Sequence, residues 1–361
     1  MRILIDIGHP AHVHLFKNLI YRLKKENHEV TITVKEIPSA IALLEKFDLP
    51  YISIGKKRDG LFFKGLHQIL YFFKLLLIVK KKKISLTVGC SITIAHLTPL
   101  TGIPSLILDD DDDHVEPLFV KYGHRYASHV LTPSSIKRKT RKAIYYNGTH
   151  ELAYLHPAYF KPDPGVFDDL GVNANTPFFI LRFVAFKGHH DRGMSGFSLE
   201  RKKILIQLLE KYGRVFINSE KQLEPSLETY RIRISPEKIH SALFYATMFI
   251  GDSQTMTSEA CILGTPAVKM NTFARLLSVP NELENKYQLC YAYKPEKFND
   301  LMNKIEELVS NKDLKVQWRD KRDALLKDKI DVTAFFVWFV ENYPQSYKIM
   351  KKNPEFQLSF K

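Results

Sequence analysis

Two short stretches concentrate the side chains that are best able to bind a metal ion or to carry a proton. HPAHVH (9–14) places three histidines in six positions, directly after the apolar run RILIDIG (2–8). DDDDDH (109–114) sets five carboxylates and a histidine in a row at the end of PSLILD (104–109). Imidazole and carboxylate groups bind metal ions and also act as general acids and bases. The spacing within each stretch and its place in the fold must decide between these chemistries.

The histidine spacing argues against a metal site. Pro10 suits the first position of a helix, because its missing N–H would have no partner there. His12 and His14 then stand two residues apart, about 200° around the helix axis, and point to nearly opposite sides. Metal-binding pairs on helices use a spacing of three or four residues instead. His9 and His12 could converge on one ion, but the third ligand would have to come from elsewhere, so we predict no metal here.

Strands and helices alternate along the chain, a pattern typical of parallel, doubly wound α/β sheets. In the first half we expect strands at 2–8, 28–34, 51–54, 84–89, 104–109 and 128–133, with helices at 10–27 and 39–47. A proline-rich stretch without periodicity, 147–177, reads as a connection between domains. In the second half we expect strands at 178–183, 214–219, 247–252 and 266–270, and helices at 199–212, 236–246, 254–264, 295–310 and 330–342.

This pattern predicts two Rossmann-like domains with a cleft between them. The chain has 361 residues, which is too long for one ordinary core. We expect an N-terminal domain over 1–165 and a C-terminal domain over 170–330. The last helix and tail, 331–361, are expected to pack back on the N-terminal domain.

The sharpest strand-to-helix junction lies in the second half, in FIGDSQTMTSEACILGTPAV (249–268). A buried strand should end at Ile250, and the turn after it should lead into a helix. Ligands of open α/β sheets bind at the carboxyl ends of strands, where free backbone N–H groups of a helix start can hold a phosphate. The hydroxyls of Ser253 and Thr255 would add to such a site. Glu259 follows about one helical turn later and could accept hydrogen bonds from a ribose diol.

The residues of this junction carry a family resemblance. Gly-Asp-Ser-x4-Ser-Glu-Ala-x3-Gly-x-Pro resembles the donor-nucleotide motif of GT-B fold glycosyltransferases, and it is also similar to the same segment of the UDP-N-acetylglucosamine 2-epimerases, which share that fold. The chain as a whole resembles a bacterial and archaeal family of predicted glycosyltransferases. The matching stretches are DIGHPAHVHLFKNLI (6–20), YNGTHELAYLHPAYFKPDP (146–164), RFVAFKGHHDRG (182–193) and SPEKIHSALFYATMFIGDSQTMTSEACILGTPAV (235–268).

The resemblance implies a donor site in the C-terminal domain. It implies phosphate contacts at Ser253, Gln254 and Thr255, and a ribose contact at Glu259. It also implies that the nucleotide base lies near His240 and the loop of Asn218, Ser219 and Glu220. The chain departs from the epimerases at one point, because the glycine pair that commonly follows the serine there is Gln254-Thr255 here.

Cationic side chains at the end of the first strand of the second domain, and in the segment after it, could offset the charge of a departing nucleotide diphosphate. Arg182 and Lys187 are the first of these, followed by His189, His190 and Arg192. A solvated basic loop is the alternative for each of these residues.

The resemblance also implies where the first of the two stretches, HPAHVH (9–14), lies in the fold. The first βα loop of a GT-B N-terminal domain faces the cleft where donor and acceptor meet. A histidine there, with a pKa near neutrality, can act as general base on an acceptor hydroxyl. His12 is our candidate for that base and His9 the second, while His14 is expected to be an ordinary packed residue.

The acidic run has two interpretations. Asp109-Asp110-Asp111 formally matches the Asp-x-Asp that binds manganese and the diphosphate in the other glycosyltransferase class, GT-A. That interpretation would leave the Glu259 segment without a role. The alternative is a solvated or hydrogen-bonding loop. In that loop, Asp110 or His114 would contact the acceptor or would orient a residue that contacts it.

Charge and hydropathy bear on the partners of the protein. Fifty-three Lys and Arg residues against 39 Asp and Glu give a net charge of +14, but the basic residues do not alternate with aromatics on a recognition element, so we predict no nucleic acid partner. The lysine run 80–83 follows the apolar stretch 61–79, in which Lys64, His67 and Lys74 rule out a bilayer crossing. The segment 61–83 is either an interfacial helix attracted to an anionic membrane surface or a buried helix of the domain.

These expectations combine into one function. The N-terminus is not a signal peptide and three dispersed cysteines form no disulfide framework, so the cytoplasm, including the inner face of the membrane, is the expected location. We expect a GT-B glycosyltransferase that moves a sugar, most simply from a UDP-sugar, to an acceptor held by the N-terminal domain. A lipid-linked saccharide of surface polysaccharide assembly would suit 61–83, and no metal or other cofactor is expected. The alternatives are a nucleotide-sugar epimerase or hydrolase of the same fold, and a non-catalytic protein that binds nucleotide sugars or polyanions.

Overall fold

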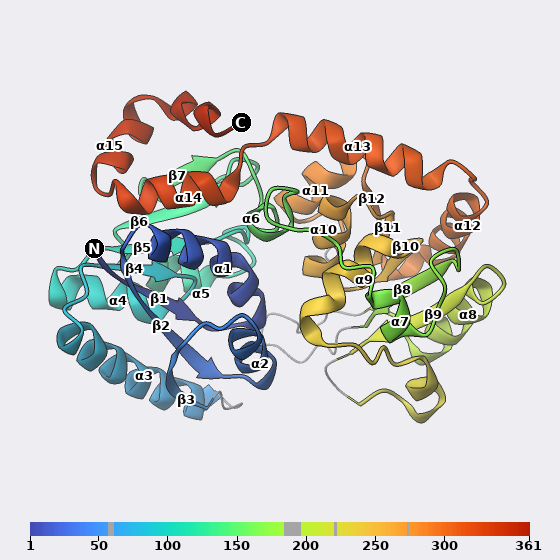
Figure 1. Cartoon of the computed structure of the whole chain (residues 1–361), viewed down its shortest axis with the longest axis horizontal. Coiled ribbons are helices and arrows are strands. Elements are labelled where there is room, and N and C mark those ends of the chain that lie inside the picture. The colour runs from blue at the N-terminus through green and yellow to red at the C-terminus, as the bar shows by residue number, and fades with distance from the viewer. Residues whose placement is uncertain (57–60, 184–195, 220–221, 273) are drawn as a thin grey trace. The chain divides into compact units, whose positions relative to one another are not determined.

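The computed structural model describes the whole chain except residues 57–60, 184–195, 220–221 and 273 (Figure 1). The chain divides into two compact units. Unit 1 contains residues 1–154 and 329–361, and unit 2 contains residues 155–328. The last 33 residues thus belong to unit 1, although the whole of unit 2 separates them in sequence from the rest of unit 1.

Unit 1 is built on a seven-stranded sheet in which every neighbouring pair is parallel. The strand order is β3-β2-β1-β4-β5-β6-β7. The central strands carry runs of Ile, Leu and Val that are buried on both faces, as parallel sheets require. The strands are β1 (Arg2–Ile7), β2 (Glu29–Glu36), β3 (Ile52–Lys56), β4 (Leu86–Gly89), β5 (Ser105–Leu108), β6 (His129–Pro133) and β7 (Ala143–Tyr146).

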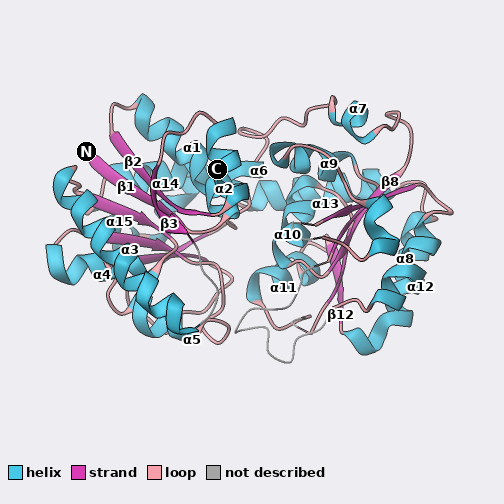
Figure 2. Ribbon diagram, turned by 90° about the horizontal axis from the view of Figure 1, so that it is seen from below, coloured by secondary structure: helices cyan, strands magenta, loops and turns pink. Residues whose placement is uncertain are grey.

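Helices cover both faces of this sheet (Figure 2). One face is covered by α1 (Pro10–Lys25), α2 (Pro38–Lys46) and α14 (Val332–Glu341), which contact one another through α1. The other is covered by α3 (Leu61–Lys81), α4 (Ile92–Thr101), α5 (Pro117–Phe119) and the short π-helical turn η1 (Val120–His124). The remaining helical segments are α6 (Leu152–Leu155), α15 (Gln345–Lys352) and η6 (Pro354–Phe360).

The helix α3 within segment 61–83 has one buried apolar side and one exposed apolar side. Tyr71, Leu75 and Val79 recur every four residues and are buried in the core of unit 1. Ile69, Phe73 and Leu77 recur with the same spacing two residues earlier, on the opposite side of the helix, and are exposed, as is Leu70. Among the residues described, no helix combines the length and the hydropathy that a bilayer crossing requires.

Unit 2 is built on a five-stranded parallel sheet with the order β12-β11-β10-β8-β9. Its strands are β8 (Phe178–Arg182), β9 (Arg214–Asn218), β10 (Met248–Gly251), β11 (Ala267–Met270) and β12 (Cys290–Tyr293). Its helices are α7 (Val166–Leu170), α8 (Leu199–Leu209), α9 (Ile239–Tyr245), α10 (Gln254–Leu263), α11 (Ser278–Asn285), α12 (Phe298–Val309) and α13 (Leu314–Asp328), with 3-10 turns η3 (Pro225–Tyr230), η4 (Pro236–Lys238) and η5 (Pro295–Lys297).

Each sheet reverses its direction of growth once, and both reversals lie where the sequence predicted chemistry. In unit 1 the chain moves outward from β1 through β2 to β3 and then returns to β4 on the other side of β1. In unit 2 it moves from β8 to β9 and then returns to β10 on the other side of β8. Ligands of open α/β sheets bind at the carboxyl ends of strands at such a reversal. The loops after β1 and β10 therefore occupy the expected positions for two functional sites.

Candidate active site

The histidines of the first loop have three different environments. His9 caps the start of α1, where its Nδ1 accepts the Ala11 N–H at 3.2 Å, and it remains exposed. His14 is buried between the rings of Phe47 and Tyr154, at centroid distances of 5.8 and 5.5 Å. His12 lies on the other side of the helix from His14, as the spacing predicted.

His12 is held as a neutral imidazole. Its Nδ1 accepts the backbone N–H of Gly8 at 3.2 Å. Burial, followed by the nearby His9 and His150, lowers the pKa of His12 to about 3. At neutral pH the ring therefore carries one proton, and the hydrogen bond from Gly8 places it on Nε2.

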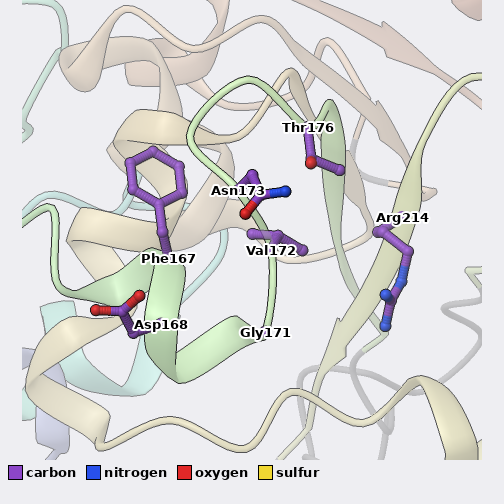
Figure 3. A pocket seen from close by; sticks show the side chains of 7 residues that line it. All are labelled: Phe167, Asp168, Gly171, Val172, Asn173, Thr176 and Arg214. Carbon is purple, nitrogen blue, oxygen red and sulfur yellow. The ribbon is translucent and has the colours of Figure 1, made fainter.

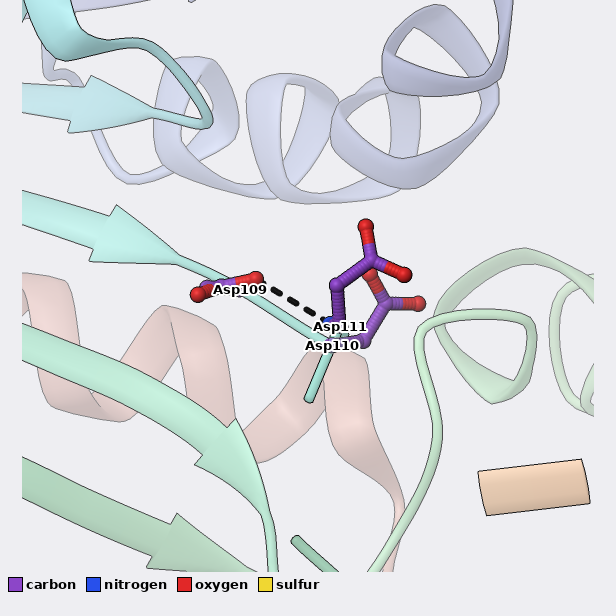
Figure 4. Close-up of side chains that lie close together, drawn as sticks. All are labelled: Asp109, Asp110 and Asp111. Atoms are coloured by element: carbon purple, nitrogen blue, oxygen red, sulfur yellow. Dashed lines mark hydrogen bonds between the residues drawn. The ribbon is translucent and has the colours of Figure 1, made fainter. Parts of the chain in front are cut away.

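The start of the acidic run forms a hydrogen-bonded loop at the end of β5. Asp109 Oδ1 accepts the Asp111 N–H at 3.1 Å (Figure 4). Asp109 Oδ2 lies 2.7 Å from His124 Nε2 and 3.1 Å from the buried Arg138 Nη2. Arg138 also donates to Asp113 Oδ1 at 2.9 Å. Carboxylate oxygens of residues 109–111 gather within 4.8 Å of one another, but both oxygens of Asp109 already have partners inside the protein.

Asp110 forms an ion pair that the sequence analysis did not identify. Its Oδ2 lies 3.1 Å from Nδ1 of His150, in the loop between β7 and α6. Burial alone would lower the pKa of His150, but the charge and the hydrogen bond of Asp110 outweigh it and raise that pKa. Burial likewise raises the pKa of Asp110, and His150 more than compensates, so that this pKa is lowered. The two opposite shifts describe one buried pair with the proton on the histidine.

Two further carboxyl groups beside this pair hold their protons unusually strongly. Burial, and then repulsion from Asp110, raises the pKa of Glu151 to about 7 and that of Asp111 to about 8. His150 Nε2 and Glu151 Oε2 are buried without a hydrogen-bond partner among the residues described. Strongly shifted groups of this kind gather at sites of proton transfer. The carboxyl ends of β1 and β5 and the loop after β7 thus bring together His12, Asp110, Asp111, His150 and Glu151, which we call the unit 1 cluster.

The C-terminal tail fixes the loop that carries His150. The N–H of Ile330 donates to the Asn147 carbonyl at 3.0 Å, and the Asn147 N–H donates to Gln357 Oε1 at 2.6 Å. A Cβ atom at Gly148 would lie 2.3 Å from Val332 Cγ2, so only glycine allows α14 to approach this closely. His150 and Glu151 lie in the stretch 146–164, which is one of the stretches that carry the family resemblance. That resemblance is the signal in the sequence that could have identified these two residues.

In unit 2 the junction of β10 and α10 has the predicted form. Gly251 ends β10, where a Cβ atom would lie 2.3 Å from the Arg182 carbonyl oxygen of the neighbouring strand. Ser253 caps α10, and its Oγ accepts the Met256 N–H at 3.4 Å. Asn271 Nδ2 donates to the Asp252 carbonyl at 3.0 Å and ties the turn to the end of β11. Gly264 ends the helix in the left-handed conformation, with φ +77°.

The predicted donor-site residues around this turn are partly brought together. Glu259 Oε1 lies 3.0 Å from His240 Nε2, and both side chains are buried. Arg182 Nη1 donates to the Asn218 carbonyl at 3.4 Å, and the Ser219 carbonyl accepts from Arg231 at 3.0 Å, so their loops lie beside β8 and β9. Thr255 is exposed on the first turn of α10. Lys187 and Glu220 lie outside the described residues, as do His189, His190 and Arg192.

A separate cavity of about 470 Å³ lies in unit 2 at the opposite end of the strands from the junction of β10 and α10 (Figure 3). Its lining includes Phe167, Val172, Thr176 and Arg214. Arg214 begins β9 and Thr176 precedes β8, so the cavity lies at the amino ends of these strands. That position separates it from the junction of β10 and α10 at the carboxyl ends.

Comparison with known proteins assigns the chain to a family. The model of the family DUF354, described as a protein of unknown function, matches residues 1–335. The chain belongs to this family. This DUF354 protein is also similar to the uncharacterized protein MJ0665 of Methanocaldococcus jannaschii, with 24% identity over 345 residues that cover 90% of the chain and 96% of the relative.

Solved structures show the fold. The DUF354 chain matches S. aureus MnaA in its co-structure with UDP, with a TM-score of 0.69 and 11% identity over 96% of this chain and 97% of that one. UDP-GlcNAc 2-epimerase from Neisseria meningitidis, bound to UDP-GlcNAc, matches with a TM-score of 0.65 and 12% identity over 88% and 94%. CalG4, the calicheamicin glycosyltransferase, matches with a TM-score of 0.58 and 14% identity over 95% and 97%. The DUF354 protein therefore has the two-domain α/β fold of GT-B glycosyltransferases and UDP-GlcNAc 2-epimerases, as the resemblance predicted.

Proposed function

We propose that this protein is a glycosyltransferase that moves a sugar from a UDP-sugar to an acceptor hydroxyl. The observation that carries the proposal is the turn between β10 and α10. It lies at the reversal of the unit 2 sheet, begins with a glycine that no larger residue can replace, and opens a helix capped by Ser253. A helix start of this kind favours a diphosphate, and the S. aureus MnaA structure with the same fold contains UDP.

The donor contacts follow from this placement. Ser253, Gln254 and Thr255 face the diphosphate at the start of α10, and Arg182 and Lys187 offset the charge of the leaving group. Glu259 holds the ribose, with His240 as the group that orients its carboxylate at 3.0 Å. The nucleotide base lies toward His240, Ser219 and Glu220. Helix N–H groups and basic side chains carry the leaving-group charge, so the reaction needs no metal ion.

The unit 1 cluster supplies the proton acceptor for the hydroxyl that attacks the sugar. His12 is the base that the sequence predicted, with His9 beside it. Its ring is neutral at physiological pH, but its pKa of about 3 lies well below the near-neutral value expected from the sequence and makes it a weaker base. His150 is a second candidate, since Asp110 holds its Nδ1 while Nε2 has no partner in the described part of the chain. The two candidates differ in pKa, which makes them separable by experiment.

The acceptor is a lipid-linked saccharide, and an anionic membrane surface is the partner of α3. The exposed stripe of Ile69, Leu70, Phe73 and Leu77 has exposed fractions of 55, 50, 55 and 68%. Lys80 to Lys83 follow it directly and are all exposed. An apolar helical face with a basic end binds the interface of anionic bilayers, with about 1 kcal/mol contributed by each lysine near the surface.

The test of the donor site is a thermal-shift screen of nucleoside diphosphates and nucleotide sugars, with and without EDTA. Because a ligand that binds only the folded state stabilises it, UDP and one UDP-sugar should raise the Tm. A shift that survives EDTA supports metal-independent transfer. If no nucleoside diphosphate raises the Tm at a millimolar concentration, the proposal is wrong.

The same protein then separates transfer from the alternatives. An epimerase or hydrolase of this fold would convert its UDP-sugar or release UDP without any acceptor. A transferase should release UDP at an appreciable rate only when an acceptor, such as a lipid extract, is added. A protein that binds nucleotide sugars without catalysis would shift its Tm and release no UDP in either mixture.

A further inference from the structure

Gln254 stands where the epimerases commonly carry the first glycine of a pair, and its side chain is engaged in an unusual contact. Gln254 is the first residue of α10, at the turn proposed to hold the diphosphate. Its Oε1 accepts a hydrogen bond from the ammonium of Lys269 at 2.5 Å. Lysine has no acceptor atom, so the amide oxygen must face Lys269 and the NH2 group must face away from it. Nε2 is buried in the ligand-free structure and has no hydrogen-bond partner among the described residues.

Lys269 is a buried lysine that forms no ion pair with a carboxylate of the described residues, and Glu284 acts on it only from a longer distance. Lys269 lies in β11, beside Gly251 of β10, and its side chain is 1% exposed. Lysine is almost never fully buried unless it is paired. In the described chain its ammonium has a neutral amide as its hydrogen-bond partner, and burial lowers its pKa. A buried ammonium in this position costs free energy unless an anion nearby repays it.

A second buried lysine in unit 2 shows the structural use of such a residue. The ammonium of Lys315, on α13, donates to the last carbonyls of α9, at Phe244, Tyr245 and Ala246. Those carbonyls carry the negative end of the helix dipole, so Lys315 is a helix cap. Lys269 instead points to Gln254 at the positive end of α10, where a cation opposes the dipole. A purely structural role therefore explains Lys315 but leaves Lys269 unexplained.

We propose that Lys269 is a positioning residue for the diphosphate of the donor, acting through Gln254. Its ammonium fixes the Gln254 amide so that the NH2 group, together with the first N–H groups of α10, is presented to the anion. The side-chain amide supplies a donor where the epimerases have glycine, and the charge of Lys269 adds to the positive end of the helix. This inference rests on the proposed donor site.

The experiment measures the Kd of UDP, UMP and uridine for the full chain by calorimetry. Lys269→Met and Gln254→Met should each raise the Kd of UDP at least about tenfold, the ratio expected for losing one hydrogen bond to a charged group. The Kd of uridine should change less than about twofold, because uridine carries no phosphate. The double variant should bind UDP no worse than either single variant, because the two residues act as one unit.

Two further variants separate this role from folding. Gln254→Glu gives Lys269 a buried counter-ion and should keep the Tm, yet it places a negative charge at the anion site and should weaken UDP binding more than Gln254→Met. Lys315→Met is the matched control, and it should lower the Tm without changing the Kd of UDP. If Lys269→Met fails to fold, the Gln254 variants decide.

Five outcomes would overturn the inference. Wild-type affinity for UDP in a folded Lys269→Met protein would exclude the role, as would an equal loss of UDP and uridine binding. Unchanged UDP affinity in Gln254→Glu would do the same. A wild-type protein that binds uridine, UMP and UDP equally would overturn the diphosphate contact and this role but leave a nucleoside site, whereas one that binds none of the three would overturn the donor site as well.

Discussion

The unit 1 cluster and the turn between β10 and α10 occupy equivalent places in two similar sheets, but their polar groups are in different states. In unit 1, burial and the neighbouring charges lower the pKa of His12 to about 3 and raise the pKa of Glu151 to about 7 and that of Asp111 to about 8. In unit 2, Ser253, Asn271 and the His240–Glu259 pair form specific hydrogen bonds of 3.0 to 3.4 Å. The first arrangement suits the proton transfer proposed above, and the second suits the proposed binding of a nucleotide in one geometry. The same topological position therefore carries two different sets of polar groups, which differ in the charges that are buried together.

The largest effect should come from removing a proton acceptor in unit 1. Replacing the histidine that acts as the base, by His12→Ala or by His150→Ala, should lower turnover about 10²- to 10⁴-fold, the usual contribution of a general base. The Kd of UDP should stay unchanged in both variants. His96→Gln, on α4 in the same unit, is the matched control. Full turnover in both alanine variants would contradict a catalytic role of the cluster.

The pH dependence of turnover decides which histidine is the base. The pKa of His150 is raised above 6.5, so its ring is protonated below that value and gains the ability to accept a proton only as pH rises through it. With His150 as base, kcat/KM should rise with pH, with a midpoint above 6.5 that Asp110→Asn moves downward. With His12 as base, whose pKa is about 3, the profile should be flat between about pH 5 and 8.

A smaller effect is expected from the donor turn. Glu259→Ala should raise the Kd of UDP about tenfold or more, since it removes the ribose contact and leaves His240 without its carboxylate. Saturating UDP-sugar should restore most of the turnover, in contrast to the unit 1 variants. Calorimetry provides the measurement, with Glu200→Ala on α8 as the control. Unchanged affinity for UDP in Glu259→Ala would remove this residue from the site.

The smallest effect on the isolated reaction should come from α3. Leu77→Glu and Phe73→Glu should abolish sedimentation with phosphatidylglycerol vesicles, while activity on a water-soluble acceptor stays at the wild-type level. Lys80 to Lys83 changed to Gln should weaken binding in proportion to the charge removed and make it insensitive to salt. Ile204→Glu, an exposed apolar position on α8 of unit 2, is the control. Equal binding to pure phosphatidylcholine vesicles would contradict the electrostatic part of the proposal.

Much of the architecture could be predicted from local patterns. The strands β1, β2, β8, β9 and β10 and the helices α1 and α10 lie within about two residues of their predicted ends, and α8 ends three residues before its predicted end. The strands β7 and β12 were not predicted. Each is four residues long, and a short strand of this kind is defined by its neighbours β6 and β11 more than by its own sequence. The helix α13 was not predicted either, because its polar surface produces little apolar periodicity.

The sequence by itself determined the parallel α/β class, the opposite directions of His12 and His14, and the helix cap at Ser253. These depend on helix and strand periods and on residues that are close along the chain. Only the tertiary structure decided that Asp110 pairs with His150, that Arg138 neutralises Asp109, and that Lys269 holds Gln254. These contacts join residues separated by 15 to 40 positions, and burial decides their charge states. Burial and desolvation belong to the folded packing and cannot be seen in a local pattern of residue types.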